Sequence, residues 1–316
     1  MSSPSVVIAE PLAPQPVAWL AGHARLIHAQ GGDREALKSH LADAQGLIVR
    51  TYTIVDDELL DHAPNLKVVA RAGAGLDNID LDACRRRGIP VVHTPESNTR
   101  AVAEYVIEMI LTTLRPIAAM NEPVSDRQWH ALREASISQR SCVGARLGII
   151  GLGKIGSRVA GIGHALGMEV LYNDVLPIEP ADRMGAMPST LHDLARTCEV
   201  ISIHVDGSES NRHLVDESVF SMLRDDVVLI NAARGFVIDP AAAAAFAAAH
   251  RDARLILDVH DPEPIAADSP LPSMPNVICT PHIGAGTRAA KEQMSWVVRD
   301  VVRVLNGEPP HHAADW

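Results

Sequence analysis

Short runs of apolar residues recur along the whole chain, and segments with a helical spacing of apolar positions separate most of them. The runs are rich in Val, Ile and Leu, which is typical of strands that are buried on both faces of a sheet. Strands that alternate with helices form βαβ units, so the pattern predicts an α/β protein with parallel sheets. The expected strands are residues 5–9, 46–50, 66–71, 89–93, 147–150, 170–173, 200–204, 227–231, 255–259 and 277–280.

The segments between these runs predict helices. Asp33 is a typical N-cap for the first of them. The alanine-rich segment 241–249 is predicted to be a surface helix, because alanine is the best helix former, and residues 116–143 are expected to be irregular. The remaining helices are predicted at residues 33–44, 55–62, 80–87, 101–114 and 288–305, the last as one amphipathic helix.

The length of 316 residues is large for one hydrophobic core and suits two domains. Residues 95–100 have the composition of a crossover between domains. We therefore expect a first domain built from residues 1–97 and 287–316, and a second from residues 98–286.

Composition and charge narrow the class of protein. Apolar residues make up 47%, yet no run is long enough to span a membrane, and the N-terminus lacks a basic segment followed by an apolar core. These features favour a soluble cytoplasmic protein, and the net charge of −11 argues against a nucleic-acid surface. Four scattered cysteines without a C-x-x-C pair indicate buried thiols; they are Cys84, Cys142, Cys198 and Cys279. No metal-ligand spacing of histidines is evident, and the pair His311–His312 is assigned to an exposed tail.

A glycine-rich turn at residues 151–156 connects an apolar strand to a helix. Gly151, Gly153 and Gly156 fit the G-x-G-x-x-G pattern, in which the glycines permit a tight turn, a close approach to a pyrophosphate and close helix–strand packing. The helix that begins at Lys154 and Ile155 would offer free N–H groups to the phosphates. A glycine turn without a ligand is the alternative.

Asp174 strengthens the first interpretation. It ends the next strand at about the 20-residue spacing at which a carboxylate can accept hydrogen bonds from the adenosine ribose. Asn173 could share this role. The sequence therefore predicts a dinucleotide site, with NAD preferred because Asp174 would repel the additional phosphate of NADP.

Ionisable residues gather at the carboxyl ends of the later strands, where ligands bind in open parallel sheets. Arg234 could bind a carboxylate with two hydrogen bonds and polarise a carbonyl. His282 could exchange a proton near neutral pH, and a neighbouring carboxylate would favour its charged form. Glu263 or Asp261 could supply that carboxylate, and Asp258 could either contact a ligand or cap a turn.

A glycine-bearing loop at residues 71–80 follows a strand of the first domain. Backbone N–H groups of Gly73, Ala74 and Gly75 could cradle a small anion, although local sequence alone favours an ordinary turn. Arg50 ends the neighbouring strand and is a candidate for contact with a phosphorylated substrate.

Together these motifs resemble the D-2-hydroxyacid dehydrogenases, an NAD-dependent family, over nearly the whole chain and in the order that the family has them. The resemblance implies two Rossmann/flavodoxin-like, doubly wound parallel-sheet domains with the active site in the cleft between them, and usually a homodimer. It implies that Arg234, Glu263 and His282 form the catalytic set and that Asp258 holds the nicotinamide carboxamide. The substrate would contact Arg50, Gly73, Ala74, Gly75, Arg234 and His282. The cofactor would contact Gly151, Gly153, Lys154, Ile155, Gly156, Asp174, His204, Ala232, Ala233, Arg234, Asp258, His282 and Gly284.

The sequence departs from the family at the walls of the cofactor pocket. His260 stands where an aromatic residue is usual, residues 205–207 replace a Pro-Leu stretch, and Leu255 and Ile256 replace smaller residues. The catalytic set is intact.

The resemblance implies reversible hydride transfer between nicotinamide and C2 of a D-2-hydroxy acid. Arg50 and the 71–78 loop look most like phosphoglycerate dehydrogenase, with glyoxylate/hydroxypyruvate reductase as the close alternative. Some relatives are instead NAD-binding corepressors that recruit proteins, and this possibility stays open. The absence of an obvious disordered partner-binding segment disfavours it, and turnover with a 2-oxo acid would separate the two.

Overall fold

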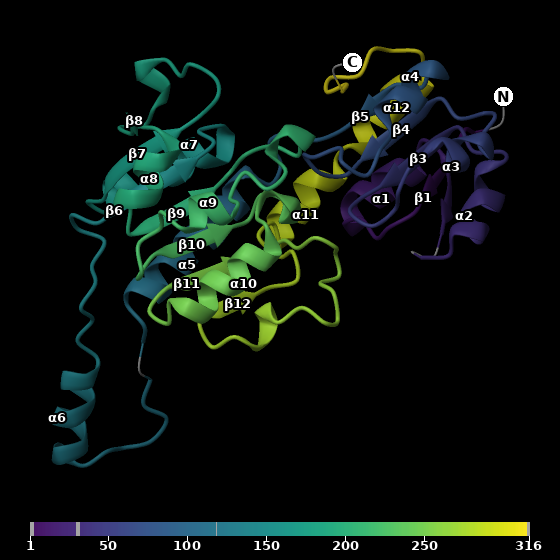
Figure 1. Ribbon diagram of the computed structural model, residues 1–316. Helices are drawn as coiled ribbons and strands as arrows, with labels where there is room; N and C mark the ends of the chain where they lie inside the picture. Colours follow the sequence, from purple (N-terminus) through teal and green to yellow (C-terminus); the bar gives the residue numbers. More distant parts are fainter. Residues whose placement is uncertain (1–2, 30–31, 118, 315–316) are drawn as a thin grey trace. The chain divides into compact units, whose positions relative to one another are not determined.

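The computed structural model describes residues 3–29, 32–117 and 119–314. The chain divides into two compact units (Figure 1). Unit 1 contains Met1–Asn98 and Ala285–Trp316, and unit 2 contains Thr99–Gly284. Each unit is described by itself.

Unit 1 is built on a five-stranded sheet in the order β2-β1-β3-β4-β5, and every pairing between these strands is parallel. This is the flavodoxin-like order, whose switch point lies between β1 and β3. All residues of β1 and β3 are buried, which explains why their sequences are continuous apolar runs. The strands are β1 (Ser5–Ile8), β2 (Arg25–His28), β3 (Gly46–Val49), β4 (Val68–Arg71) and β5 (Val91–Val92).

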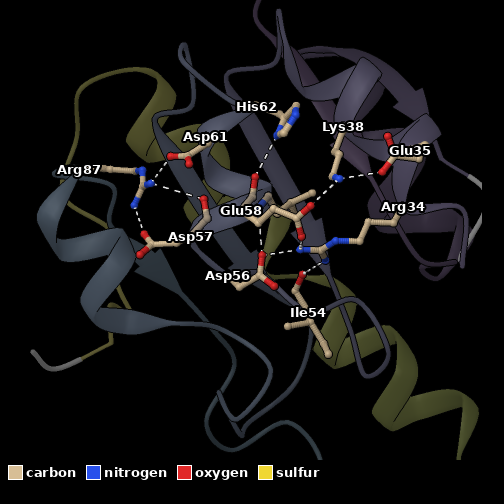
Figure 2. A network of polar contacts seen from close by, with 11 residues as sticks. Arg34, Glu35, Lys38, Ile54, Asp56, Asp57, Glu58, Asp61, His62 and Arg87 are labelled. Atoms are coloured by element: carbon tan, nitrogen blue, oxygen red, sulfur yellow. Dashed lines mark hydrogen bonds and ion pairs between the residues drawn. The ribbon is translucent and has the colours of Figure 1, made fainter.

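Aspartate N-caps begin three of the helices in unit 1. Asp33, Asp56 and Asp80 each accept a backbone N–H from the first helical turn. The helices that they open, α2, α3 and α4, are joined at the surface by the ion pairs shown in Figure 2, in which Arg34 and Arg87 contact carboxylates of α3 and its cap. The helices of unit 1 are α1 (Pro14–Ala21), α2 (Arg34–Leu41), α3 (Asp57–Asp61), α4 (Leu81–Arg86), α11 (Arg288–Ser295) and α12 (Val298–Leu305).

Unit 2 contains a seven-stranded sheet in the order β12-β11-β10-β9-β6-β7-β8, again with parallel pairing throughout. Counted from β6, this is the Rossmann order, with the switch point between β6 and β9. The two sheets confirm the predicted pair of doubly wound parallel-sheet domains. The strands are β6 (Arg146–Ile150), β7 (Glu169–Asn173), β8 (Met187–Pro188), β9 (Val200–Ile203), β10 (Val228–Asn231), β11 (Arg254–Leu257) and β12 (Val277–Cys279).

The α-helices of unit 2 pack on its sheet, except for α6, which has no buried residue. The alanine-rich helix α10 buries Ala243, Phe246 and Ala247, so one of its faces belongs to the core. The α-helices are α5 (Thr99–Leu114), α6 (Asp126–Ala135), α7 (Lys154–Ala165), α8 (Leu191–Thr197), α9 (Glu217–Phe220) and α10 (Pro240–Ala249). Short 3₁₀ helices are η1 (Pro180–Asp182), η2 (Glu209–Asn211), η3 (Gly235–Val237) and η4 (Leu271–Ser273).

Two predictions of local structure were wrong. The stretch 116–143, of which residue 118 lies outside the described residues, contains α6, which a capping box between Ser125 and Gln128 opens. The predicted helix 288–305 is two helices, because Ser295 donates a hydrogen bond back to the carbonyl of Lys291 and accepts one from the Ala13 backbone N–H. Such back-bonding bends helices. The sequence reading also missed α1 and β2.

Three further findings concern membrane spans, metal ligands and cysteines. None of the described helices is both long and apolar enough to cross a membrane, and no cluster of potential metal ligands occurs within the described ranges. The four cysteines are free thiols, and Cys84, Cys142 and Cys198 are buried as predicted, whereas the prediction was wrong for Cys279, which is partly exposed. His311 and His312 are exposed as predicted, although their backbone N–H groups donate to Asp300.

Candidate active site

The three glycines of the turn after β6 have three different surroundings. Gly151 has a φ of 91°, and a Cβ there would lie 2.8 Å from the His204 carbonyl. A Cβ at Gly156 would lie 2.1 Å from the carbonyl oxygen of Gly151, so only glycine allows the helix to pack this closely. A Cβ at Gly153 would meet nothing within 4 Å. The open space at Gly153, beside the first turn of α7 at Lys154 and Ile155, fits a pyrophosphate.

Asp174 lies beside this turn. Its Oδ2 accepts the backbone N–H of Leu152 at 2.7 Å, and its Oδ1 accepts that of Leu176 at 2.8 Å. The carboxylate of Asp174 is therefore fixed between the end of β7 and the glycine turn, where the ribose of a bound dinucleotide would lie.

His204 contributes to this region through its backbone. Its ring is turned to Ser202, whose hydroxyl lies 2.9 Å from Nε2, and Nδ1 is buried without a partner among the described residues. Burial lowers the pKa of His204 to about 3, so the ring is neutral. The backbone of residues 204–205 forms one wall of the close contact with Gly151.

The loop after β10 is shaped by Asn231, which is 1% exposed. Its side chain accepts the backbone N–H of Ala233 at 3.1 Å and donates to the carbonyl of Arg234 at 2.9 Å. Gly235 then packs against the loop after β11, since a Cβ there would lie 2.0 Å from the carbonyl of His260. This contact brings the backbone beside Arg234 against the segment that leads to Glu263. Ala232 lies between Asn231 and Ala233 in the same turn.

Asp258 is 1% exposed and accepts several hydrogen bonds from the turn that carries His282. Its carboxylate accepts the Thr280 hydroxyl and the backbone N–H groups of Ile283 and Gly284, each at 2.7 Å. The carbonyl of Asp258 accepts the backbone N–H of His282 at 2.8 Å. These hydrogen bonds support the alternative prediction that Asp258 caps a turn, and they fix the backbone around His282.

Glu263 and His282 form the central pair. Nδ1 of the ring lies 2.9 Å from Oε2 of Glu263, and the other oxygen accepts the backbone N–H of His260 at 3.0 Å. Burial alone would raise the pKa of Glu263, but these hydrogen bonds and the neighbouring imidazoles hold it below its usual value. An ionised carboxylate can only accept, so Nδ1 carries the proton and Nε2 is left for proton exchange. Asp261, the other candidate acid, instead pairs with Arg212 at 3.1 Å.

Unit 1 holds four of the residues expected to bind substrate, namely Arg50, Gly73, Ala74 and Gly75. The carbonyl of Gly73 accepts the backbone N–H of Thr94 at 3.0 Å, and that of Ala74 lies 2.8 Å from Nδ1 of His93. No acceptor among the described residues takes the backbone N–H of Ala74 or Gly75, which leaves these groups for an anion.

Several supporting residues escaped the sequence reading. Glu10, Tyr105 and Thr280 carry no motif, and only their hydrogen bonds to loops of the candidate site identify them. Asn231 stands in the motif beside Arg234, so its scaffolding role could have been suspected from its position at a strand end.

Comparisons with known proteins find similar sequences and structures. The sequence model of a family described as "D-isomer specific 2-hydroxyacid dehydrogenase, NAD binding domain" matches residues 107–284. A solved structure, D-lactate dehydrogenase from Aquifex aeolicus complexed with NAD and lactic acid, superposes with a TM-score of 0.81 at 30% identity and covers 96% of each chain.

Two curated relatives have different substrates in their names. The D-3-phosphoglycerate dehydrogenase of Archaeoglobus fulgidus is 34% identical over 98% of this chain, which spans only 59% of that protein. The (S)-sulfolactate dehydrogenase of Chromohalobacter salexigens is 38% identical over 86% of this chain and 87% of its own length.

Proposed function

Because the chain belongs to the D-isomer-specific 2-hydroxyacid dehydrogenase family, we propose that it transfers a hydride between NAD and C2 of a D-2-hydroxy acid. The observation that carries this proposal is the Glu263–His282 pair, in which a carboxylate fixes one ring nitrogen and leaves the other to exchange a proton. Arg234 and the 73–75 loop would bind the substrate.

The protein's part in the reaction is binding and proton transfer. NAD, when bound, would accept or supply the hydride at its nicotinamide ring. In oxidation, neutral His282 takes the hydroxyl proton on Nε2 as the C2–H bond breaks. In reduction, protonated His282 donates that proton to the forming alkoxide. Arg234 stabilises the negative charge on the oxygen, and Glu263 stabilises the charged ring.

The turn after β6 and the residues around it would hold the cofactor. The open space at Gly153 would take the pyrophosphate, and Asp174 would accept the ribose hydroxyls. Asp174 would also repel the 2′-phosphate of NADP, which is the basis for proposing NAD. Asp258 would orient the nicotinamide through the backbone that it holds, or by accepting a hydrogen bond itself, since its carboxylate has capacity for one further donor.

For the substrate we propose 3-phosphoglycerate and its 2-oxo form. Both curated relatives are named for 2-hydroxy acids that carry a second anionic group, a phosphate or a sulfonate. Arg50, at the end of β3, is the cation that we assign to this group. Glyoxylate or hydroxypyruvate reduction remains the alternative.

The experiment is NADH consumption by the purified chain against phosphohydroxypyruvate, sulfopyruvate, hydroxypyruvate, glyoxylate and pyruvate. The highest kcat/KM is expected with phosphohydroxypyruvate. A higher value with glyoxylate or hydroxypyruvate would replace the proposed substrate. No turnover with any of the five acids would overturn the enzymatic proposal in favour of an NAD-binding corepressor.

We also propose that the chain is a homodimer. Helix α6 has no buried residue, and its segment exposes large apolar side chains that a second copy would cover. Among them are Ile117, Trp129 and Ile137, which are 87%, 44% and 60% exposed. Light scattering should give twice the mass of the chain, and a monomer with the segment intact would reject this assignment.

A further inference from the structure

The carboxylate of Glu10, just beyond β1, accepts hydrogen bonds from the backbone of the loop after β3. Glu10 is 6% exposed, and no cation pairs with it among the contacts that the described residues make. Burial alone would raise the pKa of Glu10, but hydrogen bonds from the loop hold it below its usual value. Its oxygens accept four consecutive backbone N–H groups, those of Arg50 at 3.0 Å, Thr51 at 2.9 Å, Tyr52 at 3.2 Å and Thr53 at 3.0 Å.

Side chains also hold the carbonyls of this loop. Asn78 donates to the carbonyl of Thr53 at 2.7 Å and to that of Arg50 at 3.3 Å, and Arg71 donates to the latter at 3.1 Å. At the far end, Arg34 donates to the carbonyl of Ile54 at 3.1 Å (Figure 2).

The backbone of the 50–53 loop is therefore fixed from both sides, whereas its side chains are exposed or partly exposed. Tyr52 is 73% exposed. Arg50 is partly exposed, and its guanidinium donates to the carbonyl of Pro11 at 3.3 Å, so the segment after β1 also sets the position of this cation.

The loop occupies the place where ligands bind in a sheet of this kind. Glu10 follows β1 and Arg50 follows β3, and the switch point of the sheet lies between these two strands. The 73–75 loop, which follows β4, lies at the same edge and is connected to the 50–53 loop by Asn78 and Arg71.

We propose that Glu10 is a positioning residue of the 2-oxo acid site. It fixes the 50–53 loop so that Arg50 and Tyr52 present their side chains to the group that the substrate carries on C3. This inference rests on the proposed function and deepens it. A glutamine at this position could not replace the carboxylate, because one of its two terminal groups is a donor and would face backbone N–H groups.

The test compares Glu10→Gln, Glu10→Asp and a control on the same strand. In Ser5→Ala the lost hydrogen bond, from the Ser5 hydroxyl to the carbonyl of Asp43 at 2.7 Å, is at the opposite end of β1 from the loop. The measurements are kcat and KM for the best C3-substituted 2-oxo acid, the dissociation constant of NADH from fluorescence, and the melting temperature.

Glu10→Gln should raise the KM of the C3-substituted acid about five- to tenfold, a size set by one or two lost hydrogen bonds. The KM of glyoxylate, which has no C3, should rise less, and the dissociation constant of NADH should stay within about twofold of the wild-type value. Glu10→Asp, which keeps the charge, should fall between the wild type and Glu10→Gln. Ser5→Ala should lower the melting temperature without changing either KM.

Two results would overturn the inference. One is an unchanged KM in Glu10→Gln while the melting temperature falls, and the other is an equal rise in KM for glyoxylate. If Glu10→Gln does not fold, Tyr52→Ala tests the same loop at an exposed side chain. An unchanged preference for C3-substituted acids over glyoxylate in this variant would reject the proposal. Failure of the proposed function is a separate outcome, because the wild-type chain would then turn over none of the acids.

Discussion

The substitution Glu263→Gln separates the charge of the glutamate from its shape. Glutamine keeps an oxygen that can accept the Nδ1 proton of His282, now at 2.9 Å, so the orientation of the ring is retained. The negative charge is lost, and so is the hydrogen bond that the His260 backbone N–H donates to the other oxygen, because glutamine places a donor there. Reduction needs the protonated ring, so the reductive kcat/KM is high at low pH and falls as the ring loses its proton.

The size of the effect follows from the distance between the charges. Two unit charges about 5 Å apart attract by about 3 kcal/mol at an effective dielectric constant of about 20. The side chains of His282 and Glu263 are 33% and 26% exposed, so solvent screens part of this attraction. We expect the midpoint of the reductive profile to move acidward, because the charged ring loses its paired carboxylate.

The assay is kcat/KM for the best 2-oxo acid from about pH 5 to 9. Asp261→Asn is the matched control, because Asp261 pairs with Arg212 and its loss should leave the midpoint in place. His282→Ala should lower the rate at every pH, since the proton donor is gone. An unmoved midpoint in Glu263→Gln, or a shift of equal size in Asp261→Asn, would refute the assigned pairing.

Four further predictions concern other parts of the chain. Because Asp174 would repel a 2′-phosphate, kcat/KM should favour NAD over NADP by at least about tenfold, and equal efficiency would reject this role. Arg50→Ala should raise the KM of a phosphorylated acid more than that of its unphosphorylated analogue, and equal losses would mean that Arg50 does not read the phosphate. Asp258→Asn places a donor against buried N–H groups, so calorimetry should show a loss of about 1–3 kcal/mol in the free energy of unfolding, and kinetics should show a lower kcat. An unchanged melting temperature would contradict the role of Asp258 in fixing this turn. Hydrogen bonds from arginines and a lysine lower the pKa values of Asp57 and Glu58. The stability that these two carboxylates contribute is therefore present above about pH 4.5 and is lost as the pH falls through the lowered pKa values. The stability of Arg87→Ala, measured from unfolding curves, should depend less on pH over this acidic range than that of the wild type.

The parallel sheets could be predicted from sequence because their strands are buried on both faces. Burial of this kind leaves continuous apolar runs, and all residues of β1, β3, β9 and β10 are buried. Strand β2 lacks this signal, since its two end residues are exposed at the edge of the sheet. Helix α6 was missed because none of its residues is buried and its apolar positions have no core to face.

The break between α11 and α12 depends on a contact that is distant in sequence. Ser295 accepts the backbone N–H of Ala13, a residue near the other end of the chain, and no local pattern records that contact. Glu10 was missed for the same reason, because its four partners lie after a different strand. Motif residues such as Arg234 and His282 could be named from sequence because their spacing is local to each strand end.

Glu10 and Asp258 are buried acids whose carboxylates accept backbone N–H groups of nearby loops. Each follows a strand at the ligand-binding edge of its own sheet, and each accepts at least two backbone N–H groups of a loop in the candidate site. Backbone N–H groups are numerous at such edges because the loops leave the sheet there, and an unpaired one costs free energy when buried. A carboxylate has two acceptor oxygens and no donor, so it can accept more N–H groups at once than a hydroxyl or an amide oxygen can. Glu263 differs from both, since one of its oxygens holds a backbone N–H and the other a titratable ring. This difference is the reason that we propose Glu263 for the proton-transfer pair and Glu10 for a positioning role.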